Sequence, residues 1–306
     1  MNILVTGGAG FIGSHLCDHL VNSEHNIIII DDLSSGNRAN LSCVLDVVDF
    51  HEERVEVFDF SKLSNVDAVV HLAAQVSVPV SIVDFDSSST SNLSGTVKVI
   101  DFCQRNQLPL VYASTSAVYG NLDFGDDATS SIDLLSPYAA DKYSMELYAE
   151  VAYKLHKMSS VGLRFFNVYG PRQDPNSAYS GVISIFCDRL LANKDITIKG
   201  GYQTRDFIYV KDVVDAICKS LTVAHDNDIC EQINVLTGKS ISIDQVADML
   251  IEAVGATIDP IYVDLPAGDP EKSNGATTKM ERLLGTDLES MVSIAAGLST
   301  TVNFIR

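Results

Sequence analysis

The chain has 306 residues, and 46% of them are hydrophobic, which is enough to build a large buried core in one domain or two lobes. Its formal net charge of −19 argues against binding to nucleic acid or to an anionic membrane, since both need concentrated Lys and Arg. The simplest interpretation of this acidity is a solubilising surface, and adaptation to a salty habitat is the alternative.

The first residues, Met1–Thr6, carry no basic region and lead into no long apolar segment, so the sequence predicts neither a signal peptide nor a membrane span. A soluble cytoplasmic protein is the expectation. Six cysteines are scattered without a CxxC pair, which predicts reduced, buried side chains rather than a metal site or a disulfide framework.

Short β-branched runs alternate with amphipathic segments through the first half of the chain. The predicted strands are 2–7, 26–32, 54–60, 67–74, 108–114 and 160–166, and the predicted helices include 11–22, 93–106 and 138–157. Each strand is too apolar to have a wet face, which indicates a parallel sheet covered on both sides. The predicted fold class is therefore α/β with a doubly wound parallel sheet, a Rossmann fold, over residues 1–168. After about residue 168 the rhythm breaks, so 169–306 is predicted as a smaller mixed lobe from which about 205–235 rejoins the first domain.

A glycine-rich turn follows the first predicted strand in "NILVTGGAGFIGSHL". Gly7 allows a tight turn, Gly10 lets the backbone approach a pyrophosphate, and Gly13 lets the helix that begins with Phe11 and Ile12 pack close to the strand. Asp31 follows at the spacing expected for an acid that binds the adenosine ribose, and it favours NAD over NADP. Asp59, followed by Phe60, is a candidate for the adenine amino group, and capping of a local segment is an equally good account of it.

The stretch "SPYAADK" places Tyr138 and Lys142 four residues apart, on one face of a helix that Ser136 caps and Pro137 begins. A free phenol has a pKa near ~10, and a nearby ammonium together with a cationic nicotinamide would lower it towards that of a usable base. The alternative is an ordinary exposed pair. Upstream, Ser114, Thr115 and Ser116 end a predicted strand, where ligands bind in an open α/β sheet. A hydroxyl there could relay the proton of Tyr138, although local capping explains any one of the three.

Together, "TGGAGFIG", "HLAA", "STSAVYG", "SPYAADK", "LRFFNVYGPRQDP" and "TRDFIYVKDV" resemble the extended short-chain dehydrogenase/reductase family, and within it the nucleotide-sugar 4-epimerases. The resemblance implies that 1–168 binds NAD and 169–306 binds the substrate, a UDP-sugar. It implies that Tyr138 takes the proton of the sugar 4-hydroxyl while hydride passes from C4 to the nicotinamide. The 4-keto sugar then turns and receives hydride on its other face. Thr115 matches the proton-relaying position beside Ser114, and Lys142 would also hold the nicotinamide ribose.

The resemblance also assigns residues around the two ligands. Beside the cofactor it places Leu72, Ala73, Asn92 and Phe166, of which Asn92 could equally cap a helix and Phe166 end a strand. Around the substrate it places Ser77, Thr115, Ser116, Asn167, Val182, Lys199, Arg205 and Ser273. For Arg205 the alternative is a salt bridge with Asp206 or Asp212, and the bidentate fit of guanidinium to phosphate favours the binding role.

Other enzymes of this family, which catalyse different reactions, carry a different residue at the position of Ala117. Dehydratases and decarboxylases of the family resemble "TDE" and "TSE" there, so the missing carboxyl group favours epimerisation. Ser273 matches a position where a small residue admits an N-acetyl group, which favours UDP-GlcNAc/UDP-GalNAc over UDP-glucose/UDP-galactose. Two cations common in the family are absent at Pro266 and Val80, and Lys199 or Arg172 could compensate.

Two further expectations follow from the resemblance. A homodimer would form through the helices 93–106 and 138–157, where "MELYAEVAYKLHKM" has an apolar stripe, with core packing as the alternative account of that stripe. The non-enzymatic alternative is an inactive NAD-binding regulator, and the retention of Tyr138, Lys142 and the hydroxyl cluster argues against it.

Overall fold

The computed structural model describes residues 1–175, 177, 181–265 and 270–306. The chain forms two compact units. The first comprises Met1–Val118, Leu134–Arg164 and Val214–Ile233, and the second comprises Tyr119–Asp133, Phe165–Val213 and Asn234–Arg306. Residues 119–133, which the sequence placed in the first domain, therefore belong to the second unit.

A seven-stranded sheet dominates the first unit, with the order β10-β6-β5-β4-β1-β2-β3. Its strands are β1 (Asn2–Thr6), β2 (Asn26–Ile30), β3 (Asp49–His51), β4 (Ala68–His71), β5 (Leu110–Thr115), β6 (Ser160–Phe165) and β10 (Cys230–Val235). The neighbours β1 and β2, β1 and β4, β2 and β3, and β4 and β5 are parallel. The predicted fold class is confirmed: this is the doubly wound order, which reverses between β1 and β4 and so leaves a binding crevice at the carboxyl ends of those strands.

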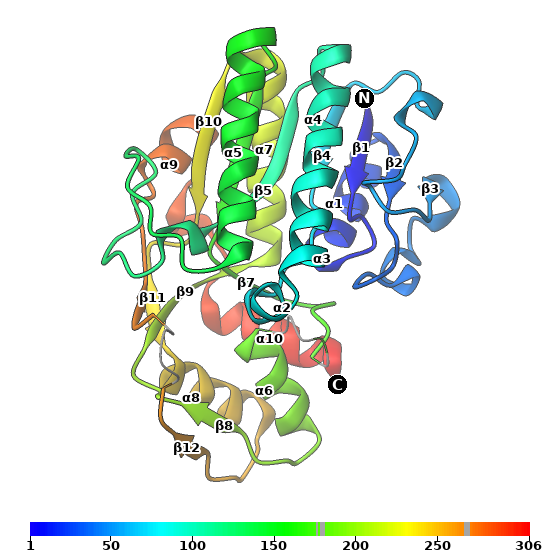
Figure 1. Ribbon diagram of the computed structural model, residues 1–306. Helices are drawn as coiled ribbons and strands as arrows, with labels where there is room; N and C mark the ends of the chain where they lie inside the picture. The colour runs from blue at the N-terminus through cyan, green and yellow to red at the C-terminus, as the bar shows by residue number, and fades with distance from the viewer. Residues whose placement is uncertain (176, 178–180, 266–269) are drawn as a thin grey trace. The chain divides into compact units, whose positions relative to one another are not determined.

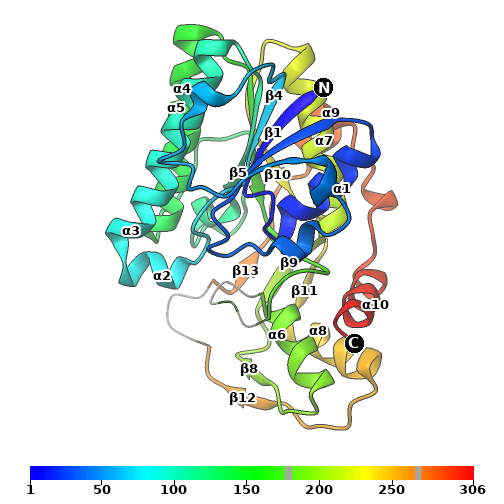
Figure 2. The same cartoon turned by 90° about the vertical axis from the view of Figure 1, so that its right-hand side faces the viewer.

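Helices cover both faces of this sheet. In Figure 2, α4 (Gly95–Asn106) and α5 (Pro137–His156) lie on one face, and α1 (Phe11–Asn22) and α7 (Val210–Asp226) lie on the other. The predicted start of α5 is correct, since the Ser136 hydroxyl accepts the amide N–H of Ala139 at 3.2 Å and Pro137 occupies the first turn. Met145 and Ala149 of α5 join the hydrophobic core against strands β1, β4 and β5.

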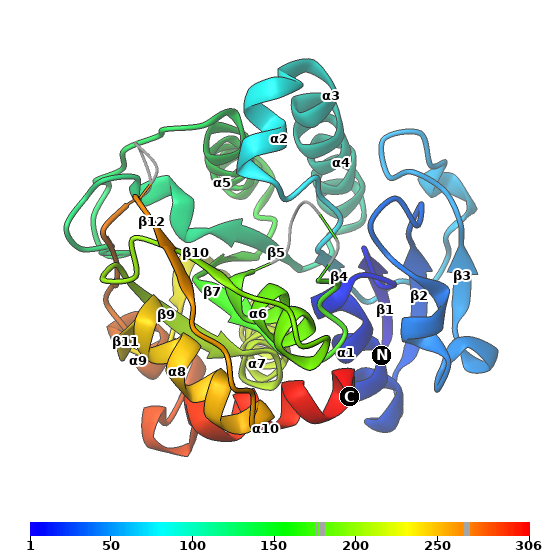
Figure 3. The same ribbon diagram turned by 90° about the horizontal axis from the view of Figure 1, so that it is seen from below.

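Three short helical elements lie between β4 and α4. They are α2 (Val78–Val83), α3 (Phe85–Ser89) and the π-helical turn η4 (Thr90–Ser94), which runs directly into α4. Both α2 and α3 contact α5, as the view in Figure 3 shows from below. The sequence did not predict these elements.

The prediction of a strand at 54–60 is wrong. The third strand of the sheet is β3, and the residues after it form turns that lead to the 3₁₀ helix η3 (Phe60–Lys62). The amide N–H groups of Val57 and Phe58 both bond to the carbonyl oxygen of Arg54, which is a turn pattern. Val55 and Phe58 are the fully buried residues of this segment and lie three residues apart rather than two, while Val57 is exposed, so burial does not follow the strand period.

Among its described residues, the second unit combines two small sheets with four helices (Figure 1). One sheet contains β7 (Asn167–Tyr169), β9 (Thr204–Tyr209), β11 (Ser240–Ser242) and β13 (Lys272–Ser273), and the other pairs β8 (Thr197–Lys199) with β12 (Ile261–Val263). The helices are α6 (Val182–Leu191), α8 (Ile243–Val254), α9 (Thr278–Leu284) and α10 (Ile294–Ile305). Tyr169, Phe207 and Tyr209 form an edge-on aromatic cluster at the centre of the larger sheet.

Among the described residues, one stretch, Leu288–Ile305, is long and apolar enough to cross a membrane by length and composition alone. It is not one helix: the 3₁₀ helix η6 (Leu288–Ser290) is separated from α10, which has 12 residues. Twelve residues rise about 18 Å, well short of a hydrocarbon core of about 30 Å. The cysteine prediction needs correction, because Cys43 is exposed and Cys218 and Cys230 are half-buried, whereas Cys17, Cys103 and Cys187 are buried.

Candidate active site

The glycine turn connects β1 to α1, and its conformation excludes side chains. Gly7 has a φ of +73°, and a Cβ there would lie 2.7 Å from the amide nitrogen of Ala73. A Cβ on Gly13 would lie 2.1 Å from the carbonyl oxygen of Gly7. Gly10 is the N-cap of α1, so the first turn, with Phe11 and Ile12, has backbone N–H groups without intrahelical partners. This is an anion-binding geometry.

Two acidic residues predicted to contact adenosine behave differently. Asp31, at the end of β2, is buried and accepts N–H groups from Ala9 and Leu33, both at 2.9 Å, and burial raises the pKa of its carboxyl group. Asp59 is exposed and caps η3, accepting the Ser61 hydroxyl at 2.7 Å, a bond that lowers its pKa. Asp59 is thus seen as a cap, and its adenine contact stays a prediction, as does that of Phe60.

The end of β4 is tied to the glycine turn through a buried histidine. His71 Nδ1 lies 2.7 Å from the Thr6 hydroxyl, and Nε2 lies 3.0 Å from the Thr96 hydroxyl. Thr96 donates its own proton to a carbonyl oxygen at 2.6 Å, so it accepts from Nε2–H, and Thr6 donates to Nδ1. Burial lowers the pKa of His71 to about 3, so the ring is neutral at pH 7. Leu72 and Ala73 follow directly, and their N–H groups bond to the Thr6 carbonyl and hydroxyl oxygens.

Asn92 lies in the π turn η4 and is buried. Its amide oxygen accepts the N–H of Gln75 at 2.8 Å, and its amide nitrogen donates to the Gln75 carbonyl at 3.0 Å and to Asp141 at 3.4 Å. The side chain therefore fixes the loop after β4 against α5 instead of capping a helix. Ser77 in that loop is buried and caps α2. A π turn inside a helix often marks a functional site.

Tyr138 and Thr115 form a direct pair. Thr115 Oγ1 accepts the N–H of Ala117 at 3.1 Å, and the Thr115 hydroxyl lies close enough to the Tyr138 phenol to lower the pKa of that phenol. Burial raises the pKa of Tyr138 above its ordinary value, and the hydrogen bond from Thr115 acts in the opposite direction. In the protein without cofactor, the Lys142 ammonium therefore does not lower the pKa of Tyr138 as the sequence predicted.

Lys142 is almost completely buried, with 2% of its surface exposed, and its Nζ donates to the carbonyl oxygen of Ala113 at 2.8 Å. Burial lowers the pKa of Lys142 to about 8, against a smaller raising effect of the adjacent Asp141. One of three ammonium N–H bonds is thus directed at β5, which leaves donors for a ligand.

The hydroxyl groups of Ser114 and Ser116 have different surroundings. Ser114 is buried and donates to the Glu146 carboxylate at 2.5 Å, so its single proton is directed into the interior. Ser116 is half-buried at the start of the 3₁₀ helix η5 (Ser116–Tyr119). Of the three candidates, Thr115 is the one that the structure pairs with Tyr138.

The second unit holds most of the predicted substrate residues. Ser273 pairs with Arg205 across β13 and β9, and the Asn167 amide lies 3.4 Å from the Ser273 hydroxyl, so these three lie together. The Arg205 guanidinium donates to the carbonyl oxygen of Thr204 at 2.9 Å. Phe166 is buried beside Tyr119, Lys199 is exposed on β8, and Val182 begins α6. Two positions lack a cation that is common in the family. Pro266 lies outside the described residues, and Val80 lies in α2.

Comparison with known proteins identifies the chain. The model of the NAD dependent epimerase/dehydratase family matches residues 3–235. The protein belongs to this family. A putative UDP-glucose 4-epimerase of Methanocaldococcus jannaschii is 34% identical, and the alignment covers 99% of this chain and 98% of that protein.

Two solved structures cover nearly the whole chain. The UDP-N-acetylglucosamine 4-epimerase of Methanobrevibacter ruminantium has a TM-score of 0.92 and 34% identity over 99% of this chain and 97% of its own. The UDP-glucuronic acid 4-epimerase of Bacillus cereus, in complex with UDP-glucuronic acid and NAD, has a TM-score of 0.90 and 31% identity over 100% of this chain and 99% of its own. The predicted family and its NAD cofactor are confirmed.

The residues of the first unit fit that cofactor. The turn at Gly7 and Gly13 leaves no room for a Cβ, the first turn of α1 has N–H groups for a pyrophosphate, and Asp31 places a buried acid at the end of β2. These features match what a dinucleotide requires, although each residue's role stays a prediction.

Sequence reasoning missed five residues that organise the site. His71 and Asp141 are next in sequence to the predicted site residues Leu72 and Lys142, and this adjacency is the only feature of the sequence that could have indicated them. Glu146 lies one helical turn beyond Lys142, and Arg164 interrupts the apolar run "SVGLRFF", where a charge in a buried strand calls for a partner. Ser81 accepts the backbone N–H of Tyr138 at 3.2 Å, a contact that no sequence pattern indicated.

Proposed function

We propose that the protein is an NAD-dependent 4-epimerase of a UDP-sugar that acts through a 4-keto intermediate. The observation that carries this proposal is the Thr115 hydroxyl beside the Tyr138 phenol, with the buried Lys142 one turn further along α5. A phenol and a hydroxyl joined in this way can bind one substrate oxygen together and move its proton.

In this mechanism Tyr138 receives the proton of the sugar 4-hydroxyl, and Thr115 holds the same oxygen and passes the proton on. Bound NAD would supply the hydride chemistry of the reaction, as acceptor of the C4 hydride in its oxidised form and as hydride donor in its reduced form. Lys142 binds the nicotinamide ribose and, with the positive nicotinamide ring, offsets the burial that raises the pKa of Tyr138. The tyrosine then returns its proton to the 4-oxygen, so no net oxidation occurs.

Epimerisation is favoured over elimination because Ala117 has no acid group. Its backbone N–H donates to Thr115 at 3.1 Å, so the position contributes to holding the relay hydroxyl. Expulsion of water or carbon dioxide by a relative of this family would need an acid or base that a methyl group cannot supply.

For the substrate we propose UDP-GlcNAc and UDP-GalNAc, with the second unit as the substrate lobe and the first as the NAD domain. The support is that Ser273, a small residue, lies beside Asn167 and Arg205, the amide and guanidinium assigned to the diphosphate. UDP-glucose is the alternative. Proton NMR of the anomeric signals, with UDP-GlcNAc, UDP-glucose and UDP-glucuronic acid in separate samples, distinguishes them. Conversion of UDP-GlcNAc is the expected result, and conversion of another sugar alone would overturn the assignment to Ser273.

The mechanism is tested by Tyr138→Phe, with NAD present. The variant should lose a factor of about 10² or more in kcat, since proton transfer by a positioned side chain contributes about 10²–10⁴. Tyr148→Phe, on the exposed face of the same helix, is the matched control and should keep the wild-type rate. A Tyr138→Phe enzyme with wild-type turnover would refute the assigned base. Binding of NAD without conversion of any UDP-sugar by the wild type would favour the inactive regulator.

We also propose a cytoplasmic homodimer that forms through α4 and α5. The support is an apolar stripe on α5 whose members are 44–70% exposed: Leu147, Tyr148, Val151 and Leu155. Side chains at this spacing share one helical face, and an exposed apolar face is typical of an interface.

A further inference from the structure

One face of α5 binds three consecutive residues of β5. Tyr138, Lys142 and Glu146 follow one another at four-residue intervals and so share a helical face. The Tyr138 phenol lies beside the Thr115 hydroxyl, which lowers its pKa. Lys142 Nζ donates to the carbonyl oxygen of Ala113 at 2.8 Å, and Glu146 accepts the Ser114 hydroxyl at 2.5 Å. The first two contacts involve predicted catalytic groups, and the third has no assigned role.

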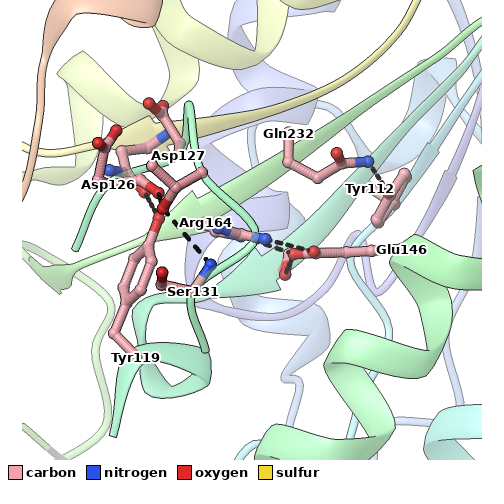
Figure 4. Close-up of polar contacts among 11 residues, drawn as sticks. Tyr112, Tyr119, Asp126, Asp127, Ser131, Glu146, Arg164 and Gln232 are labelled. Atoms are coloured by element: carbon pink, nitrogen blue, oxygen red, sulfur yellow. Dashed lines mark hydrogen bonds and ion pairs between the residues drawn. The ribbon is translucent and has the colours of Figure 1, made fainter. Parts of the chain in front are cut away.

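Glu146 is held in turn by the neighbouring strand. Arg164 of β6 donates from Nε to Oε1 at 2.9 Å and from Nη2 to Oε2 at 2.6 Å, a bidentate pair that Figure 4 shows. Both residues are buried, with 4% of Glu146 and 5% of Arg164 exposed. Tyr112, two residues before Ser114, lies nearby with its phenol hydrogen-bonded to Gln232. The carboxylate therefore joins α5, β5 and β6 at one point.

Stability alone does not explain a charged pair at this place. Removing two charges from water is costly, and apolar side chains of similar size often stabilise a core as well or better. What apolar residues cannot do is fix a hydroxyl in one orientation, which a carboxylate does when it accepts that hydroxyl and is itself held bidentately. Here the hydroxyl belongs to Ser114, next in sequence to Thr115.

We propose that Glu146, held by Arg164, is a positioning residue for the epimerase reaction. It fixes Ser114, and through the backbone of β5 it sets where the Thr115 hydroxyl lies relative to the Tyr138 phenol. Ser114 then serves as the link and not as a proton donor to substrate. The effect on turnover rests on the proposed function, whereas the effect on the Tyr138 hydrogen bond does not.

Two variants separate the parts of this device. Glu146→Gln keeps the shape but presents an NH₂ group to the Arg164 guanidinium, so the bidentate pair breaks. Ser114→Ala removes the link alone and leaves the Glu146–Arg164 ion pair in place, which keeps the proposal testable if Glu146→Gln folds poorly. Ser114→Thr restores a hydroxyl and should restore activity. Glu150→Gln is the control, since Glu150 is one turn further along α5, exposed and paired only with Lys154 among the contacts described.

The turnover experiment compares kcat and KM for the UDP-sugar that the wild type converts. A displacement of about 1 Å at a reacting group can cost about 10²-fold in rate. We therefore expect kcat of Glu146→Gln and Ser114→Ala to fall about 10–100-fold while KM changes less than about threefold, because positioning acts on the transition state. A smaller fraction of folded enzyme would also lower the apparent kcat at constant KM, so kcat is calculated for the concentration of folded protein, measured by circular dichroism under the assay conditions. Loss of stability without misplacement then leaves kcat unchanged.

The second readout needs no substrate. In protein labelled with [¹³Cζ]tyrosine, the Tyr138 resonance, assigned with Tyr138→Phe, reports the hydrogen bond to Thr115. In Glu146→Gln and Ser114→Ala it should move towards its position in Thr115→Ala, and in Glu150→Gln it should stay. If it stays in place in either Glu146→Gln or Ser114→Ala, the positioning role is refuted, whether or not the wild type is an epimerase. If the wild type converts no UDP-sugar while the resonance moves as expected, the proposed function fails and the positioning of Tyr138 stands.

Discussion

The burial of Lys142 gives a prediction whose magnitude the structure sets. Burial lowers the pKa of Lys142 from 10.5 to about 8, and at 1.36 kcal/mol for each pH unit this corresponds to a cost of folding of about 3 kcal/mol at pH 7. Lys142→Met replaces the ammonium by an apolar side chain of similar length and removes that cost. It also leaves the carbonyl oxygen of Ala113 without the bond that Lys142 makes, which costs about 1–3 kcal/mol. The two effects nearly cancel at pH 7, so the variant should be as stable as the wild type or slightly more stable.

The pH dependence is the sharper part. The folded-state pKa lies below the unfolded one, so the cost is largest below pH 8 and disappears as the pH rises from about 8 to 10.5. Between pH 7 and pH 10, the free energy of unfolding of the wild type should therefore rise by about 2–3 kcal/mol relative to that of Lys142→Met. Urea unfolding of both proteins without NAD measures the difference, in which other titrating groups cancel.

A control on the same helix identifies the cause. Lys154→Met removes an exposed lysine of α5 that pairs with Glu150, and its effect should stay within about 0.5 kcal/mol at every pH. A Lys142→Met variant whose stability difference from the wild type is constant between pH 7 and pH 10 would refute the argument from burial. The kcat of Lys142→Met should fall by at least about 10²-fold, since the charge near Tyr138 is lost.

Three further predictions concern the glycine turn, the dimer and the charge. Gly13→Ala places a Cβ 2.1 Å from the Gly7 carbonyl oxygen, so calorimetry should find weaker NAD binding and a loss of stability of about 1–3 kcal/mol; unchanged NAD affinity would contradict the close approach. Val151→Glu puts a charge in the exposed stripe of α5 and should convert a dimer into a monomer in light scattering, and a monomeric wild type would refute the dimer. Raising NaCl from 0.05 to 0.5 M should stabilise a chain of net charge −19 against urea by screening its self-repulsion, and lower stability in high salt would contradict that.

The doubly wound sheet was predictable because its signals are local. The runs at β1, β2, β4, β5 and β6 are continuous and apolar, and a glycine turn marks where the first helix begins. The run at 54–60 alternates apolar and charged residues, as a strand can, and is not a strand, since Val55 and Phe58 are buried on a turn. The true third strand is the three-residue β3, with a pattern too short to detect. The transfer of Tyr119–Asp133 to the second unit depends on long-range contacts that no local pattern encodes.

The candidate site shows the same division at the level of single atoms. Sequence spacing placed Tyr138 and Lys142 on one face of a helix and brought three hydroxyls to the end of β5. It could not say which hydroxyl has a proton to give, because that depends on partners distant in sequence: Glu146 lies 32 residues from Ser114. The structure assigns the Ser114 proton to Glu146 and the Thr115 hydroxyl to Tyr138.

Hydrogen bonding and charge together decide when Tyr138 can act as a base. In the protein alone burial raises its pKa, Thr115 offsets only part of that effect, and Lys142 is bonded to Ala113. Tyr138 is therefore a neutral phenol at pH 7 until more positive charge arrives nearby. The cationic nicotinamide of the family's cofactor is such a charge, and it is present only when hydride transfer is possible. In the proposed reaction, coupling the base to the cofactor in this way would tie deprotonation of the sugar to oxidation of C4, because one without the other leaves a charge in a buried site.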